Sequence, residues 1–189
     1  CLSVLRRLQR GGRLSRQESL CFSAASSGQL EELKVLRADD TPWDRSTSFV
    51  AASCGHLDML QWAHANGCPC DEMTCAGAAE GGHLEVLQWL RANGCPWDEK
   101  PMIFAAKEGH EAVVRALIDL GADVNKAKDN GGTLLFMAAQ EGHEAVLRVL
   151  IKAGADVKKA KDNGVTPLFM AAQEGHEAIV QILRDAGAV

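Results

Sequence analysis

The sequence contains no uninterrupted apolar stretch of roughly 18 residues, the length that spans a bilayer as a helix. A membrane span is therefore not expected. It also lacks the paired Cys-x-x-Cys motifs that are typical of structural zinc sites. Its seven cysteines are an odd number, and their spacing does not suggest a disulfide framework. We therefore expect reduced thiols and a cytoplasmic protein, with the nucleus as the alternative compartment.

Acidic residues outnumber basic ones outside the first 20 residues. The formal net charge of the chain is −5, and the first 20 residues carry five arginines and one glutamate, or +4, which leaves −9 on the remainder. An acidic body is a poor match for a phosphate backbone. We therefore expect no binding of nucleic acid by the main part of the chain.

Catalytic motifs are also missing. No nucleophile–base pair, glycine-rich phosphate loop or pair of carboxylates stands out in the sequence. The string HEAVV at 110–114 begins like a zinc-protease motif, but Val114 stands where that motif needs its second histidine. We therefore expect a protein that is not an enzyme, with no cofactor, no metal site and no small-molecule substrate.

What the sequence does contain is a Gly-His pair at regular intervals. It occurs at residues 55–56, 82–83, 109–110, 142–143 and 175–176, after a degenerate Gly28-Gln29. The successive steps are 27, 27, 27, 33 and 33 residues. A period of this size indicates a solenoid of stacked supersecondary units.

Each unit has the pattern of two short helices. The first is built on a double alanine, and the glycine of the Gly-His pair follows it, where a helix end favours a left-handed residue. An acidic residue then opens the second helix, which carries an apolar stripe such as Val146, Leu147 and Leu150. Another glycine closes the unit. The pattern predicts helix–turn–helix, repeated.

Two of these units resemble ankyrin repeats. They read NGGTLLFMAAQEGHEAVLRVLIKAGADV (130–157) and NGVTPLFMAAQEGHEAIVQILRDAGA (163–188), with Thr133-Leu-Leu-Phe and Thr166-Pro-Leu-Phe in place of the family's TPLH box. The upstream units, with LQWLRANGCPWDE (87–99) and LQWAHANGCPCDE (60–72), resemble a shorter, divergent form of the repeat found in protists and giant viruses.

The resemblance implies an all-α ankyrin solenoid at residues 20–189, with about six repeats and the last incomplete. Asn130-Gly131 and Asn163-Gly164 suit tight turns, so the segment KAKDNG and its copy predict short β-hairpin fingers in the C-terminal half only, over 122–132 and 155–165. The shorter repeats should have tight turns at 40–47, 67–74 and 94–101. Residues 1–19 are expected to form a basic N-terminal extension or a capping helix.

The family's usual role implies a monomeric scaffold or adaptor that binds a protein partner through the concave face of the solenoid. The candidate contact residues lie on the finger segments and at the ends of the first helices; they are Lys126, Lys128, Asp129, Asn130, Gln140, Glu141, Lys159, Lys161, Asp162, Asn163, Gln173 and Glu174. One alternative is the recognition arm of a larger enzyme or of a ubiquitin-ligase adaptor. Another is a repeat spacer without a dedicated ligand, because lines 130–145 and 163–178 differ at two positions only and their surface has not diversified.

Several other residue groups are interpreted as structural. The histidines of the Gly-His pairs recur at the period of the fold, so we expect them to bridge turns of adjacent repeats. Cys68, Cys70 and Cys75, with His64 and Cys54 in range, resemble a metal cluster, but a shift of 27 residues places apolar residues or cysteine at their positions, which favours packing. The four tryptophans are likewise expected to pack between the shorter repeats. The final helix keeps the apolar residues Ile179, Val180, Ile182 and Leu183, so we expect apolar surface there and a chain that is part of a longer array.

Overall fold

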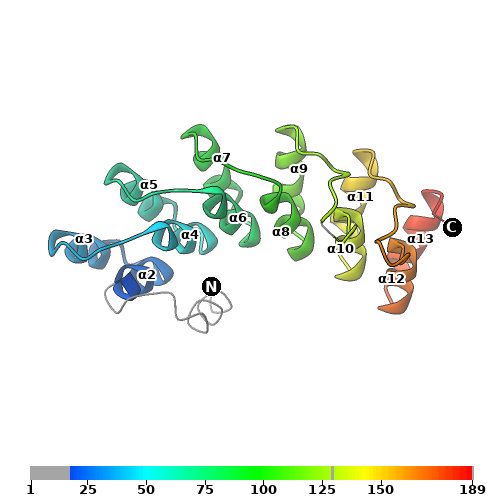
Figure 1. Cartoon of the computed structure of the whole chain (residues 1–189), viewed down its shortest axis with the longest axis horizontal. Coiled ribbons are helices and arrows are strands. Elements are labelled where there is room, and N and C mark those ends of the chain that lie inside the picture. The colour runs from blue at the N-terminus through cyan, green and yellow to red at the C-terminus, as the bar shows by residue number, and fades with distance from the viewer. Residues whose placement is uncertain (1–17, 129, 189) are drawn as a thin grey trace. The chain divides into compact units, whose positions relative to one another are not determined.

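The computed structural model describes residues 18–128 and 130–188, and its chain divides into two compact units, Cys1–Lys100 and Pro101–Val189. Each unit is built from pairs of short antiparallel helices joined by tight turns (Figure 1). The predicted extension or capping helix at residues 1–19 falls outside the described residues, apart from the two residues that begin the first described helix.

Three helix pairs form the described part of the first unit: α2 (Glu18–Ser27) with α3 (Leu30–Ala38), α4 (Arg45–Ser53) with α5 (Leu57–Ala65), and α6 (Glu72–Glu80) with α7 (Leu84–Ala92). The second unit has α8 (Lys100–Glu108, which starts on the last residue of the first unit) with α9 (Glu111–Asp119), α10 (Leu134–Gln140) with α11 (Glu144–Lys152), and α12 (Pro167–Gln173) with α13 (Glu177–Asp185). The predicted all-α repeat architecture is confirmed.

The double alanines lie where neighbouring first helices meet. In the first unit α4 packs against both α2 and α6, and in the second unit α10 packs against α12. Ala51 and Ala52 on α4, like Ala138 and Ala139 on α10, have no exposed surface. Small side chains at these positions let the helix backbones approach closely, which explains why alanine recurs at each step.

The second helices bury the predicted apolar stripe. On α11 the side chains of Val146, Leu147 and Leu150 are fully buried, and α11 packs against both α9 and α13. Glu144 stands in the first turn and Lys152 in the last, so both charges oppose the helix dipole at their own end. On the exposed side, Glu144 forms an ion pair with Arg148 at 2.9 Å.

The Gly-His pairs join one repeat to the next. Each glycine of these pairs has a positive φ, for example 82° at Gly142, as predicted for a left-handed helix end. At His56, His83, His143 and His176 the ring reaches back to a backbone carbonyl of the preceding repeat. Its Nε2 lies 3.2 Å from the oxygen of Ser53 in the case of His83, and 3.1 Å from that of Gln140 in the case of His176. These contacts confirm that such histidines bridge adjacent repeats.

The connections between repeats differ in length as predicted. Residues 39–44, 66–71 and 93–99 are short links, whereas residues 120–133 and 153–166 are about twice as long. A tight turn closes each long link, but the described residues there contain one isolated antiparallel bridge, Ala127 to Thr133, and no strand. The connections of the C-terminal repeats are therefore longer than those of the N-terminal repeats, as predicted. Paired β-hairpins in the long connections stay a prediction.

Candidate interaction surface

The turn at Asn130-Gly131 forms the tip of the first long connection. The backbone N–H of Lys128 donates to the carbonyl of Gly132 at 3.0 Å, and that of Gly131 donates to the carbonyl of Lys128 at 2.9 Å. The Asn130 side chain accepts from the N–H of Gly132 at 3.1 Å. Gly131 has a φ of 75°, a conformation that glycine adopts without strain. The second tip repeats this pattern at Lys161, Asn163, Gly164 and Val165.

The two long connections are bonded to each other. The N–H of Asp162 donates to the carbonyl of Asn130 at 3.3 Å, which joins the tips. Nearer the second helices, the Asn125 amide donates to the carbonyl of Gly154 at 3.1 Å and accepts from the N–H of Asp156 at 2.8 Å. Neighbouring connections are therefore held in a fixed register by backbone groups and one asparagine.

Helix α10 starts directly after the first tip. The side chain of Thr133 is buried and accepts from the N–H of Phe136 at 3.1 Å, which caps the helix. This start places Phe136 and Met137 near the tip, and it puts Gln140 and Glu141 at the far end of the helix. The Gln140 amide donates to the Glu141 carboxylate at 3.2 Å.

These elements surround an open depression of about 150 Å³, which we call the tip depression. It is lined by Lys107, Lys128, Asn130, Gly132, Phe136, Met137, Gln140, Glu141 and Lys161. The Lys161 ammonium lies 4.9 Å from the centroid of the Phe136 ring, within the range of a cation–π contact. Three lysines and one glutamate thus line the depression, and the aromatic ring of Phe136 and the thioether of Met137 form its floor.

Five of the predicted contact residues therefore meet in one place: Lys128, Asn130, Gln140, Glu141 and Lys161. The others do not line this depression. Lys126 and Lys159 are exposed on the connections, where the Lys159 ammonium lies 3.5 Å from the carbonyl of Asn125. Asp162 is exposed beside the second tip, and Asp129 lies outside the described residues.

The last repeat presents the remaining predicted residues. Gln173 and Glu174 are exposed at the end of α12, and Asn163 lines a second open depression of about 460 Å³ against α12 and α13. Phe169 in that depression is 58% exposed, whereas its counterpart Phe136 is 2% exposed. Of the apolar residues named on the final helix, Ile179 and Leu183 are buried and Val180 and Ile182 are half-buried, so the expected apolar surface there is only partly present.

Sequence reasoning did not assign Asn125 or Lys107 to this surface. Asn125 could have been found because its counterpart 33 residues later is Lys158, so the asparagine is a departure from the repeat. Lys107 comes from α8, one repeat earlier in the sequence. No feature of the sequence alone indicated that its side chain would reach the same depression.

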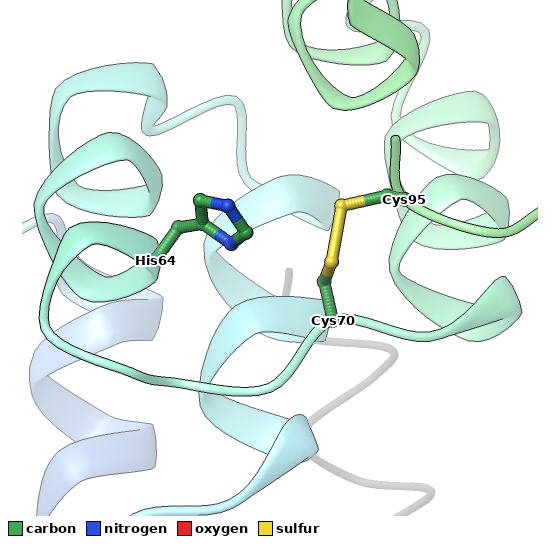
Figure 2. A group of neighbouring side chains, drawn as sticks. All are labelled: His64, Cys70 and Cys95. Carbon is green, nitrogen blue, oxygen red and sulfur yellow. A yellow bond between two sulfur atoms is a disulfide. The ribbon is translucent and has the colours of Figure 1, made fainter. Parts of the chain in front are cut away.

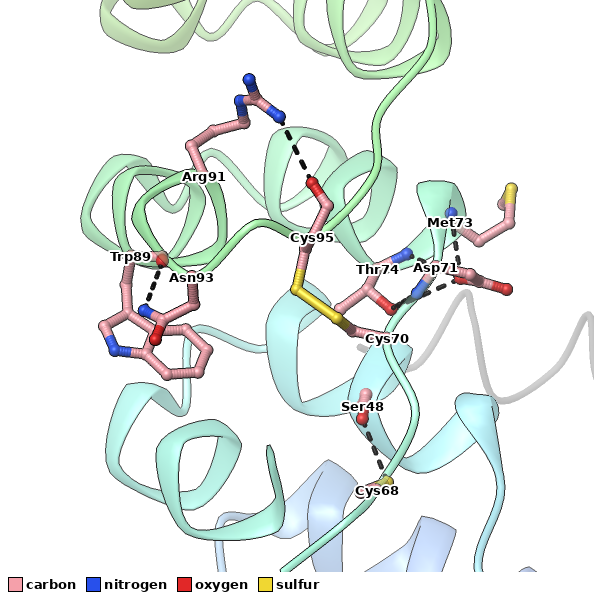
Figure 3. Close-up of a disulfide and its surroundings, with 10 residues drawn as sticks. All are labelled: Ser48, Cys68, Cys70, Asp71, Met73, Thr74, Trp89, Arg91, Asn93 and Cys95. Atoms are coloured by element: carbon pink, nitrogen blue, oxygen red, sulfur yellow. Dashed lines mark hydrogen bonds between the residues drawn. A yellow bond between two sulfur atoms is a disulfide. The ribbon is translucent and has the colours of Figure 1, made fainter. Parts of the chain in front are cut away.

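The expectation of reduced cysteines is wrong for three residues. Cys70 and Cys95 form a disulfide between adjacent short connections, with their Cα atoms 6.0 Å apart (Figure 3), and Cys54 is disulfide-bonded as well. In the 27-residue repeat, the position that corresponds to Cys95 is Cys68. The bonded residues are 25 apart, so the disulfide joins two positions that are not equivalent in the repeat. Cys21, Cys68 and Cys75 are free buried thiols. Burial raises the pKa of Cys68 and of Cys75 to about 11.

The tryptophans pack between the shorter repeats, as expected. Trp43 meets Trp62 edge-on at 5.7 Å between ring centroids. The guanidinium of Arg37 lies 4.4 Å from the Trp43 ring, and that of Arg91 lies 4.7 Å from the Trp97 ring. Arginine therefore stacks on the tryptophan of the link that follows it.

The family model for ankyrin repeats matches the chain in three overlapping copies, at residues 48–127, 75–161 and 102–189, which is well over half of its length. The chain belongs to the ankyrin-repeat family. No curated protein matches it. Ankyrin repeats generally mediate protein–protein interaction and are typically not catalytic. No described helix of this ankyrin-repeat protein is long and apolar enough to cross a bilayer.

Proposed function

We propose that the protein is a monomeric scaffold or adaptor whose ankyrin repeats bind a protein partner through the concave face, with the tip depression as the centre of contact. The observation that carries this proposal is the convergence of Lys128, Asn130, Gln140, Glu141 and Lys161 on one depression. These residues come from two successive connections and one helix end.

The charge of the depression favours a partner segment that carries acidic side chains. Lys107, Lys128 and Lys161 outnumber Glu141 among its charged lining residues. Phe136 and Met137 form its apolar part. A rim with an excess of positive charge orients an acidic partner, while Phe136 and Met137, which are already buried, form a rigid floor.

The bonds between the connections support a preformed surface. Asn125 and the Asp162–Asn130 backbone bond hold the two tips together before any partner is present. A surface of this kind loses little conformational entropy on binding.

The proposal is tested by affinity capture with the full chain and two variants of equal charge change. Lys128→Glu with Lys161→Glu reverses the rim, and Lys152→Glu with Lys34→Glu reverses two lysines on second helices, away from the depression. We expect partners that are retained by the native chain and by the control but lost from the rim variant. Capture that is equally strong with the rim variant would contradict the assignment of this surface.

A spacer without a dedicated ligand is the second candidate. The unvaried pairs Gln140-Glu141 and Gln173-Glu174 favour it, because a surface adapted to one partner should diversify between repeats. The same capture experiment separates the two, since a spacer returns no reproducible partner. The third candidate, the recognition arm of a larger enzyme or of a ubiquitin-ligase adaptor, uses the same surface, and the complete reading frame would identify it.

A further inference from the structure

Three potential metal ligands from different segments of the first unit lie together. His64 is in the last turn of α5, Cys70 is in the link that follows, and Cys95 is in the link of the next repeat. Their ligand atoms, one imidazole nitrogen and the two sulfurs, all lie within 4.8 Å of one another (Figure 2). His64 and Cys70 are partly exposed, so solvent and small ions reach the group, whereas Cys95 is buried.

This repeat departs from its neighbours at two of these positions. Twenty-seven residues to either side of His64 stand Arg37 and Arg91, and twenty-seven residues to either side of Cys70 stand Trp43 and Trp97. In both neighbours the arginine stacks on the tryptophan. The middle repeat replaces this stacked pair with an imidazole and a thiol, and both replacements occur beside Cys95.

Contacts next to the three residues hold the segments that carry them. Cys70 directly precedes Asp71, which caps α6 by accepting from the N–H groups of Met73 and Thr74 at 3.0 and 3.2 Å (Figure 3). The Arg91 guanidinium donates to the carbonyl of Cys95 at 3.3 Å. The His64 ring packs edge-on against Trp89, with ring centroids 5.4 Å apart. The backbone at Cys70 and Cys95 and the ring of His64 are therefore held in place by their surroundings.

We propose that the reduced form of this group binds one thiophilic divalent cation, of which zinc is the type, through His64, Cys70 and Cys95. Two thiolates and one imidazole are a ligand set that zinc prefers, and a water molecule would complete a tetrahedron. Two sulfurs on one zinc ion lie about 3.8 Å apart for Zn–S bonds of about 2.3 Å. Cα atoms at 6.0 Å allow that separation by side-chain rotation.

The disulfide and the metal exclude each other, because both use the same two sulfurs. A thiol reductant of the glutathione class converts the disulfide into two thiols and is itself oxidised to its disulfide, a transfer of two electrons. The cation then displaces one proton from each thiol, and the imidazole contributes a lone pair. Two protons are therefore released for each divalent cation bound. The oxidised form of the same reductant, a small disulfide, reverses the step: it accepts two electrons from the loaded thiolates and, with two protons, becomes two thiols, while the protein disulfide re-forms and the cation leaves.

The test uses the full chain, reduced with a phosphine that is then removed, and Co²⁺ as the probe under anaerobic conditions. We expect the reduced chain to bind one Co²⁺ with thiolate-to-cobalt charge-transfer absorption, to release two protons, and to exchange the Co²⁺ for Zn²⁺. The oxidised chain should show no such absorption. Absence of the absorption from the reduced chain, or its presence in the oxidised chain, would overturn the proposal.

The neighbouring repeats provide matched variants. His64→Arg with Cys70→Trp restores the stacked pair of both neighbours, and Cys95→Ala places at 95 the residue found at the corresponding position, Ala122. Each should weaken Co²⁺ binding by roughly 100-fold or more, since loss of a supporting contact alone costs 10- to 100-fold. Cys75→Ser, whose counterpart is Ser48, is the control and should bind as the native chain does. Native affinity in Cys95→Ala, or a loss in Cys75→Ser, would show that other groups hold the ion.

Discussion

At Gly142, a glycine of one repeat lies in close contact with a histidine of the next repeat. A Cβ atom added at Gly142 would lie 2.8 Å from Cε1 of His176, the same ring whose Nε2 reaches the carbonyl of Gln140. The glycine is therefore needed twice, once for its positive φ and once for the space that it leaves to the ring. At Gly175, which has the same type of φ, nothing lies within 4 Å of such an atom.

Gly142→Ala should consequently lower the free energy of unfolding more than Gly175→Ala does. The left-handed backbone alone destabilises an alanine by about 1–2 kcal/mol at either position. At Gly142 the displaced imidazole also loses a hydrogen bond, which adds about 1 kcal/mol. Denaturant unfolding of the two variants measures the difference, and equal free energies of unfolding would show that the ring yields without cost.

The buried thiol of Cys68 should make stability depend on alkaline pH. Its pKa is raised to about 11, mainly by burial, so the folded state keeps the proton at pH values where the unfolded thiol has lost it. The protonated thiol contributes its full stabilisation below about pH 8.5, the usual pKa of a free thiol. As the pH rises toward 11 the folded state loses this stabilisation, which amounts to about 2–3 kcal/mol of the free energy of unfolding. Urea unfolding between pH 8 and 11 of the native chain and of Cys68→Ser tests this. The serine variant should lose less stability over that interval, and identical slopes would contradict the assignment.

Among the elements, the two long connections owe part of their register to one asparagine. Asn125 reaches across to the backbone of the next connection with both ends of its amide, to Gly154 and Asp156. The short links are joined by cysteines instead: the Cys68 thiol donates to the carbonyl of Asp44 at 3.4 Å, and the Cys70–Cys95 disulfide connects the next two links.

Asn125→Ala should loosen the second connection without unfolding the helices. Amide exchange at Asp156 should become roughly fivefold faster or more, as expected for the loss of a hydrogen bond worth about 1 kcal/mol. Asn66→Ala is the control, since the Asn66 amide bonds only to its own helix at Trp62. Unchanged exchange at Asp156 in Asn125→Ala would mean that the backbone bond between the tips suffices.

The sequence was enough to predict the helix pairs, because each depends on contacts that recur at a fixed spacing. The glycine φ values and the bridging histidines followed from the same spacing. The Cys70–Cys95 bond did not, because its separation of 25 residues is not a multiple of the repeat and depends on how adjacent links face each other. Lys107 was missed for a related reason: its place in the tip depression depends on packing between repeats.

For the molecule as a whole, position in the stack decides what a residue contributes. Lines 130–145 and 163–178 are nearly identical, yet Phe136 is buried beneath the following repeat and Phe169 is 58% exposed. The difference lies in the neighbours and not in the local sequence.

Phe136→Ala and Phe169→Ala should therefore have unequal effects. The first creates a cavity and should cost about 3–5 kcal/mol, whereas the second removes a side chain that is mostly in water and should cost under about 1 kcal/mol. Chemical unfolding of the two variants provides the comparison. A large loss from Phe169→Ala would show that this ring is covered in solution, for example by a second copy of the chain.

The contact between α10 and α12 joins two near-copies of one sequence. One side of this repeat is therefore complementary to the opposite side of its own duplicate. This is a head-to-tail contact, whereas a twofold dimer pairs the same patch on both partners. A gene segment that encodes such a unit carries both halves of a joint. Copying it in tandem supplies a new repeat together with the surface on which that repeat is seated, and no further substitution is required for the two to fit.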